Sequence, residues 1–287
     1  MGSGYFKKSQ VKRAYLFLLP AMVLFVAVIV YPIGATLGTS FWKQGISLAH
    51  YRSVFQKEEF PAVLLQTAIW TFGGMAIIFT IGFILALSLS ENFFGYKAAR
   101  ILLLLPWATP IAISALMWRY IFNDQYGILN FLINVVGITN TRIPWLARTV
   151  SGFAANMTVE IWSGIPLMTL ILLSGLQSIP NEVYEAAIVD GATYWKSLWR
   201  ITIPLMRPVF IVATLMFVIW TFNSFPVIYI ITRGGPIHST DTLVTYIYKI
   251  AFQYGLFEEA TALAAITFLI ILVFSVPYAR QYFRVEE

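Results

Sequence analysis

The stretch EAAIVDGATYWKSLWRITIPLMRP, residues 185–208, is a charged segment between two long apolar runs. The whole chain of 287 residues is 59% hydrophobic and only 11% charged, whereas soluble domains have about 25% charged residues. A chain this apolar predicts a polytopic helical membrane protein, with the quoted stretch as one of its loops. The charged side chains of the stretch are Glu185, Asp190, Lys196, Arg200 and Arg207.

Six apolar runs are long enough to cross the hydrocarbon core of a bilayer, which takes roughly 20 apolar residues per helix. Because lipid offers no hydrogen-bond partners and the runs are continuously apolar, we expect helices and not barrel strands. The first run is longer than the apolar core of a cleaved signal peptide, so we expect it to be retained. The expected spans are Tyr15–Leu37, Leu64–Ser90, Ile101–Ile121, Gly152–Leu176, Val209–Ile231 and Thr261–Tyr278.

The distribution of Lys and Arg predicts the orientation in the membrane. With the N-terminus inside, the inside segments carry about 11 Lys and Arg in about 63 residues, against about 8 in roughly 86 outside. Since cytoplasmic loops are enriched in these residues, we expect a cytoplasmic segment at 1–14, a cytoplasmic tail at 281–287, and the quoted stretch in the longest cytoplasmic loop. The net charge of +6 is therefore interpreted as a topology signal. No Lys- or Arg-rich run carries interleaved aromatics at the spacing of a segment that binds single-stranded DNA, so no nucleic-acid partner is expected.

The quoted stretch predicts two short helices that meet at a bend. Pro180 suits the first turn of a helix, and Glu185 is favourable near the positive end of its dipole. Gly191 permits either a sharp turn or a very close backbone approach. The second helix is expected over Thr193–Ile201, with Pro204 as its end. Such a loop suits docking into a partner's groove, while its tryptophans leave open that the second half lies on lipid as an interfacial helix.

These residues resemble the EAA loop in permease subunits of binding-protein-dependent ABC importers. That pattern is EAA, three residues, Gly, nine residues, Ile, one residue, Leu-Pro, and here Ile203 replaces the leucine. The preceding LLSGLQSIPNEVYEAA and the later TRGGP resemble the carbohydrate-uptake subfamily, in particular its first, maltose-type permease subunit. The residues of the pattern are Glu185, Ala186, Ala187, Gly191, Ile201 and Pro204, with Asp190 inside it.

The resemblance implies an all-α type I importer permease fold with six transmembrane helices and cytoplasmic coupling helices. It implies a permease core at 64–280 with the coupling loop at about 178–207, where Glu185 forms an ion pair in a cleft of an ATPase subunit. It also implies the partners: a second homologous permease, two ATPase subunits and an extracytoplasmic substrate-binding protein, in the inner or plasma membrane of a bacterium.

A phosphate-binding loop would read GxxxxGK[ST] after a strand. The nearest match, GATYWKS at 191–197, is one residue shorter than this pattern and has Trp195 directly before its Lys-Ser, in place of the second glycine. We therefore expect no cofactor on this chain, and ATP and magnesium on the partner ATPase subunits. The chain has no cysteine, which excludes disulfides, thiol catalysis and zinc–thiolate sites.

Glu160 is the one acidic residue well within an expected span, where an ionisable side chain usually faces a partner or a wet cavity. The resemblance places sugar-facing residues on the span before the EAA loop. Counting from Glu185 selects one face of that span and one face of the next by helical spacing, with Trp220 and Asn223 as neighbours of the second face. A buried helix–helix hydrogen bond, or a place at the outer interface, is the alternative for Glu160. The candidate substrate residues are Glu160, Gly164, Leu167, Phe217, Trp220, Thr221, Asn223 and Ser224.

The sequence thus predicts a transport subunit, not an enzyme, that moves a di- or oligosaccharide into the cytoplasm with energy from ATP hydrolysed on other subunits. An independent secondary transporter of a small polar solute is the alternative, although those folds usually carry paired repeats. An intramembrane enzyme would need two or more polar catalytic groups inside the spans, and Glu160 alone does not supply them.

Overall fold

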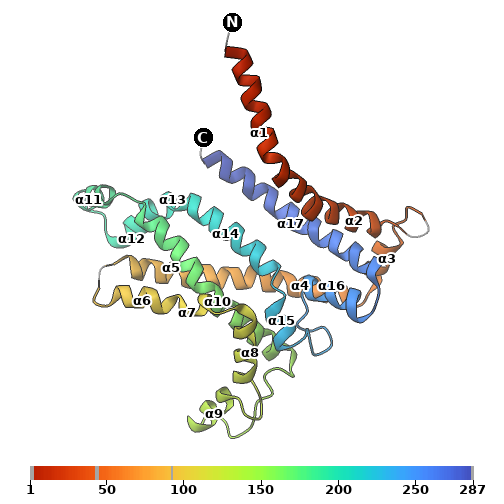
Figure 1. Cartoon of the computed structure of the whole chain (residues 1–287). Coiled ribbons are helices and arrows are strands. Elements are labelled where there is room, and N and C mark those ends of the chain that lie inside the picture. The colour runs from red at the N-terminus through yellow and green to blue at the C-terminus, as the bar shows by residue number, and fades with distance from the viewer. Residues whose placement is uncertain (1–2, 43–44, 92, 286–287) are drawn as a thin grey trace. The chain divides into compact units, whose positions relative to one another are not determined.

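The computed structural model describes residues 3–42, 45–91 and 93–285, which form helices joined by turns (Figure 1). The expected cytoplasmic segment begins, and the expected tail ends, on residues outside this range. Within it, five helical stretches are long and apolar enough to cross a membrane, and a bent pair makes six. These stretches are Gln10–Ser40, Phe60–Ser90, Thr149–Gln177, Arg207–Ile231 and Phe257–Val276, and the bent pair is Tyr96–Ala108 with Ile111–Ile121.

The chain divides into two compact units, and the smaller one combines residues up to Lys57 with Ile247–Ile266. Ser53 Oγ donates to Glu259 Oε1 at 2.7 Å, and Lys57 Nζ lies 2.9 Å from Glu259 Oε2. These contacts fix α3 to the beginning of α17. The helices of this unit are α1 (Ser3–Phe25), the π-helix η1 (Val26–Val30), α2 (Tyr31–Ser40), α3 (Ala49–Gln56), the π-helix η4 (Lys249–Gln253) and the first part of α17 (Phe257–Val285).

The larger unit combines Glu58–Tyr246 with the chain from Thr267 onward. Three of its helices, α5, α10 and α14, pack against one another around a core of aliphatic and aromatic side chains. Its elements are α4 (Phe60–Ala68), η2 (Ile69–Gly73), α5 (Gly74–Ser90), α6 (Tyr96–Leu103), α7 (Leu105–Ala108), α8 (Ile111–Ile121), α9 (Ile128–Val135), α10 (Thr149–Gln177), α11 (Asn181–Val189), α12 (Tyr194–Ser197), η3 (Leu198–Thr202), α13 (Ile203–Leu205), α14 (Arg207–Phe222), α15 (Pro226–Ile231), most of α16 (Leu243–Tyr248) and the remainder of α17.

Close packing between α5 and α10 depends on a glycine. A Cβ atom at Gly82 would lie 2.7 Å from Met168 Cγ, and Met168 is fully buried. Only a residue without a side chain lets the two helices approach this closely. A second contact orients α14, because the buried Trp70 indole donates to the carbonyl of Thr221 at 2.9 Å.

Two of the expected spans are broken. The third bends by 90° between α7 and α8, because Thr109 and Pro110 are extended there and a proline disfavours helical conformation in the residue before it. The fifth is interrupted between Phe222 and Pro226, where Phe225, the residue before the proline, keeps a helical conformation. In contrast, α10 contains Pro166 within a continuous helix of 29 residues.

Candidate functional site

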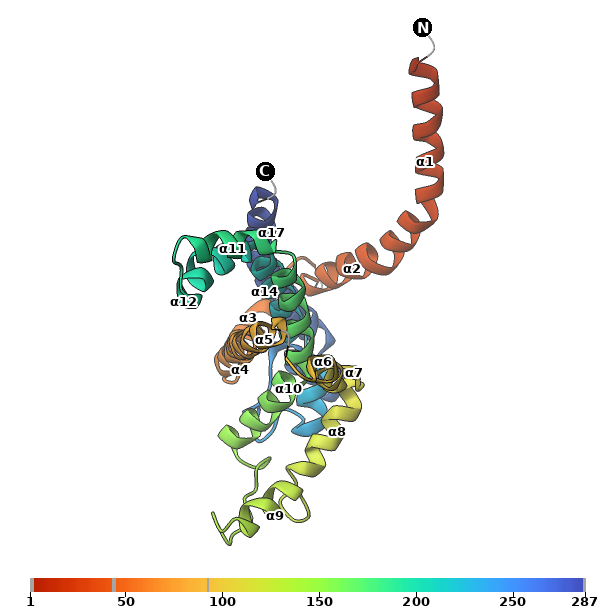
Figure 2. The same ribbon diagram turned by 90° about the vertical axis from the view of Figure 1, so that its left-hand side faces the viewer.

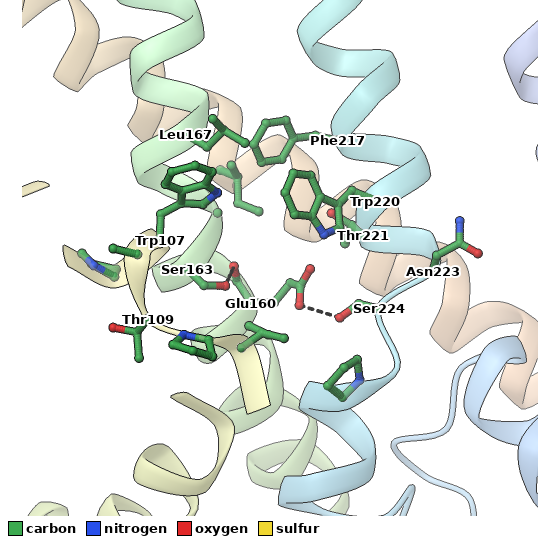
Figure 3. Close-up of a pocket in the computed structure, with 17 residues that line it drawn as sticks. Trp107, Thr109, Glu160, Ser163, Leu167, Phe217, Trp220, Thr221, Asn223 and Ser224 are labelled. Carbon is green, nitrogen blue, oxygen red and sulfur yellow. Dashed lines mark hydrogen bonds between the residues drawn. The ribbon is translucent and has the colours of Figure 1, made fainter. Parts of the chain in front are cut away.

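A cavity of about 610 Å³ lies where the two broken spans meet α10 (Figure 3). One wall comes from α10, another from the end of α14 and the break after it, and a third from the bend between α7 and α8. The structure brings all the candidate substrate residues to this cavity: Glu160, Gly164, Leu167, Phe217, Trp220, Thr221, Asn223 and Ser224 all line it.

Glu160 lies on α10 and is only 8% exposed. Ser224 Oγ donates to Glu160 Oε2 at 2.7 Å, so the carboxylate links α10 to the break that follows α14. Among the residues that the structure describes, no side chain or backbone group donates to the other oxygen, Oε1. A buried hydrogen bond between two spans, the alternative weighed for Glu160, is therefore present, and it occupies only one of the two carboxylate oxygens.

The other candidate residues differ in what they offer to the cavity. Thr221 is 1% exposed and packs into the wall. The amide of Asn223 donates to the carbonyl of Ile219 at 2.7 Å, and Figure 3 shows it directed away from Glu160. Gly164 also serves packing, since a Cβ there would lie 2.8 Å from Ile78 Cδ1.

The sequence reasoning missed the wall formed by the bend between α7 and α8. Trp107 and Thr109 line the cavity from this bend, and Figure 3 shows the Trp107 and Trp220 indoles on opposite sides of it. The motif PWATP, residues 106–110, carries the signal that could have found them. Two prolines inside an apolar run indicate a discontinuous helix, and such breaks mark binding sites in transporters.

The lining of the cavity suits a neutral polyhydroxylated ligand. It combines one carboxylate with hydroxyl groups from Thr109, Ser163 and Ser224 and with two indole rings. Hydroxyl groups of a ligand can donate to the carboxylate, and the indoles offer flat apolar faces. In the described part of the chain, no Lys or Arg lines the cavity.

The polar stretch at residues 185–208 lies at the other end of α10 and α14, where α11 and α12 are seen in both views (Figures 1 and 2). The expected bend is confirmed, because Gly191 has a φ of 71° between α11 and α12. No atom of the described residues lies within 4 Å of a Cβ built on it, so the turn explains this glycine and a close approach within the chain does not. Glu185, Ala186 and Asp190 are exposed.

Two residues of the pattern are wholly or partly buried, and one expectation for the second helix needs correction. Ala187 is 7% exposed and its carbonyl accepts from Ala192 N at 2.9 Å, so it packs inside the loop. Ile201 is half-buried. Pro204 does not end the second helix, since helical winding continues through the π-helix η3 into α13 up to Leu205; the wider winding of a π-helix accommodates the missing N–H of the proline. Sequence reasoning also missed Ile188 and Val189, which are 70% and 87% exposed at the end of α11.

Residues 78–285 match the family described as the binding-protein-dependent transport system inner membrane component. A probable ABC transporter permease protein of Brucella suis is 36% identical over 95% of this chain and 97% of its own length. The trehalose/maltose transport system permease protein of Thermococcus litoralis is 33% identical over 96% and 95%. A chain in the crystal structure of a bacterial ABC transporter that imports the acidic polysaccharide alginate superposes with a TM-score of 0.84 at 22% identity, covering 99% of both chains.

The superposition confirms the predicted all-helical permease fold, and the family match covers the cavity from Ile78 onward together with the whole loop. On the strength of that match and of relatives similar along nearly their full length, the chain belongs to the family of inner-membrane components of binding-protein-dependent transport systems.

Proposed function

We propose that this chain is the permease subunit of an ABC importer for a neutral di- or oligosaccharide. The observation that carries the proposal is the cavity in which Glu160 and Ser224 meet between two indole rings, at the breaks of two spans. Transporter sites commonly form where discontinuous helices meet near the middle of the membrane. The trehalose/maltose permease of Thermococcus litoralis supports a sugar as the substrate class.

A neutral sugar fits this cavity better than an acidic one. A buried carboxylate repels an anionic ligand, and no cation among the described lining residues would offset that repulsion. The substrate residues proposed here are Glu160, Ser224, Trp220 and Phe217 from the sequence, together with Trp107 from the bend. The resemblance in fold to the alginate importer therefore does not extend, in our proposal, to an acidic substrate.

The loop that contains Glu185 is the proposed docking site for an ATPase subunit on the cytoplasmic side. Glu185 and Asp190 are exposed on or beside α11, and the apolar Ile188 and Val189 project next to them. A short helix with exposed apolar and acidic side chains suits insertion into a groove lined by apolar and basic residues. We place both termini in the cytoplasm, because the excess of Lys and Arg favours it, and the permease core at residues 64–280.

ATP and Mg²⁺ belong to the partner subunits in this proposal. The nearest match to a phosphate-binding loop, residues 191–197, passes from the turn at Gly191 into α12, with the exposed Trp195 at the position of a required glycine. No strand precedes it among the described residues, so the backbone cradle of a P-loop is absent from this part of the chain.

The remaining partners follow from the family. We propose a second homologous permease beside this chain, two ATPase subunits at the loop, and an extracytoplasmic substrate-binding protein at the outer loops. The turn cluster at residues 233–242 is one such loop. An independent secondary transporter is the competing function, and it needs neither an ATPase nor a binding protein.

The test is sugar uptake by the complete complex reconstituted in proteoliposomes, with ATP supplied on the ATPase side. We expect uptake that requires ATP and the binding protein, and we expect Glu185→Lys to abolish it. Glu182→Lys is the matched control, since Glu182 is an exposed glutamate on the same helix. Full uptake by Glu185→Lys would contradict the docking role, and uptake by this chain alone in a proton or sodium gradient would favour the secondary transporter.

A further inference from the structure

Charge is segregated within the loop between α10 and α14. The acidic residues Glu182, Glu185 and Asp190 lie on α11 or directly after it. The helical stretch that follows, residues 194–207, carries Lys196 and two arginines and contains no acidic residue. The proposed ATPase-docking role accounts for the acidic half and leaves the basic half unexplained.

Aromatic side chains accompany the basic ones on the exposed side of this stretch. Trp195 and Trp199 are 67% and 66% exposed and lie four residues apart, so they share one side of the helix. Lys196 and Arg200 are exposed one position further along. Leu198 on the opposite side is 7% exposed. The stretch is thus anchored by its buried side and presents indole rings beside cationic groups.

A second segment at the same end of the larger unit has the same character. Phe94, in the turn between α5 and α6, is fully exposed, and Lys97 is exposed beside Tyr96, with its Nζ 6.0 Å from the Tyr96 ring centroid. Tyr96 and Tyr194 line one cavity of about 790 Å³ between the two segments. Two parts of the chain about 100 residues apart in sequence therefore bring exposed aromatic and basic groups together.

We propose that the exposed face of residues 194–207 binds the anionic phospholipid headgroups of the cytoplasmic leaflet. Trp side chains prefer the headgroup level of a membrane, and each Lys or Arg near an anionic surface strengthens attachment roughly fivefold. The face lies immediately before the stretch Arg207–Ile231, which is long and apolar enough to cross a membrane. The cytoplasmic placement rests on the proposed function.

Attachment to an anionic leaflet acts in opposite ways on the basic and acidic halves of the loop. An anionic leaflet attracts the basic stretch and repels the carboxylates of α11. The turn at Gly191 separates the two halves. The lipid surface therefore fixes the second half of the loop and leaves Glu185 directed toward the protein partner.

The experiment uses the complete complex in vesicles of phosphatidylcholine, alone or mixed with phosphatidylglycerol, whose acyl chains are brominated near the headgroups. Bromine quenches nearby tryptophans, and the difference between wild type and Trp195→Phe/Trp199→Phe isolates the signal of these two indoles. We expect this signal to be quenched, and more strongly with phosphatidylglycerol. In the double variant Lys196→Gln/Arg200→Gln, the extra quenching caused by phosphatidylglycerol should fall several-fold. The control variant Arg142→Gln/Arg148→Gln, which removes two exposed arginines elsewhere, should keep this extra quenching.

Three outcomes would overturn the proposal. The first is a signal that bromine does not quench in either lipid. The second is an equal increase in quenching with phosphatidylglycerol in the two charge variants. The third is quenching that develops only after the ATPase subunits are removed, which would assign the face to the ATPase. ATP-driven uptake in the same vesicles reports separately on the proposed function, so the failure of one is distinguishable from the failure of the other.

Discussion

Replacing Glu160 by glutamine tests the cavity most directly. The substitution keeps the size of the side chain, and the glutamine carbonyl can still accept from Ser224 Oγ, which donates to Glu160 Oε2 at 2.7 Å in the wild type. What changes is the group facing the cavity, because an amide NH₂ replaces Oε1. A sugar hydroxyl that donates to Oε1 then loses a charged acceptor.

The size of this loss follows from the hydrogen bond alone. A hydrogen bond to a charged group contributes about 1.5–3 kcal/mol, and one between neutral groups about 0.5–1.5 kcal/mol. The difference of about 1–1.5 kcal/mol corresponds to about 5–12-fold weaker binding for one lost bond. We expect the concentration of sugar-loaded binding protein needed for half-maximal uptake to rise by this factor, with the complex still assembled.

Uptake of labelled sugar by the reconstituted complex measures this effect, with the ATPase rate recorded in parallel. Ser163→Ala is the control, since the Ser163 hydroxyl lines the same cavity but donates to the backbone carbonyl of Glu160 at 3.0 Å. We expect less than about a twofold change for it, because its hydroxyl already has a partner. Unchanged uptake by Glu160→Gln, or an equal loss in both variants, would refute the role assigned to the carboxylate.

Two further predictions concern packing and stacking. Gly82→Leu should lower the thermal midpoint of the complex, because its Cβ would lie 2.7 Å from Met168 Cγ. We expect a loss of stability of about 1–3 kcal/mol or more. The control Gly73→Leu should leave the midpoint unchanged, since the nearest atom to its Cβ is a side-chain carbon at 3.9 Å. Trp220→Ala should weaken sugar transport on the order of tenfold while Trp220→Phe retains most of it, because the ring face supplies the contact. Equal thermal midpoints in the two glycine variants, or equal uptake in the two tryptophan variants, would contradict these expectations.

The parts of the fold that depend only on the length and apolar character of a segment could be predicted from the sequence. Apolar runs of sufficient length identify the spans, because the bilayer imposes the same requirement on each. The two helices at the bend of the loop follow from Gly191, whose φ of 71° few other residues adopt readily. Helical spacing placed Glu160 and Ser224 on the faces that meet.

The breaks in the spans were harder to predict, because proline in a membrane helix has several outcomes. Pro166 lies inside the continuous α10, whereas Pro110 follows the extended Thr109 at a 90° bend. The difference lies in local partners for the freed backbone groups, which a single sequence does not reveal. Trp107 was missed for this reason. The burial of Ala187 could not be predicted from the sequence either, because it depends on how the two halves of the loop fold together.

The arrangement of α10 and α14 suggests how the loop and the cavity communicate. Each of the two helices that flank the loop also reaches the cavity. α10 meets the loop at Gln177 and carries Glu160, and α14 begins at Arg207 and ends just before Ser224. From Gln177 to Glu160 the unbroken helix spans about 25 Å at 1.5 Å per residue. Because a packed helix moves as a rigid body, a displacement of α11 relative to α13 would change the separation of Glu160 and Ser224. The hydrogen bond between them is therefore a natural point for the cavity to open or close on a ligand, and Ser224→Ala should make sugar release less dependent on ATP than it is in the wild type.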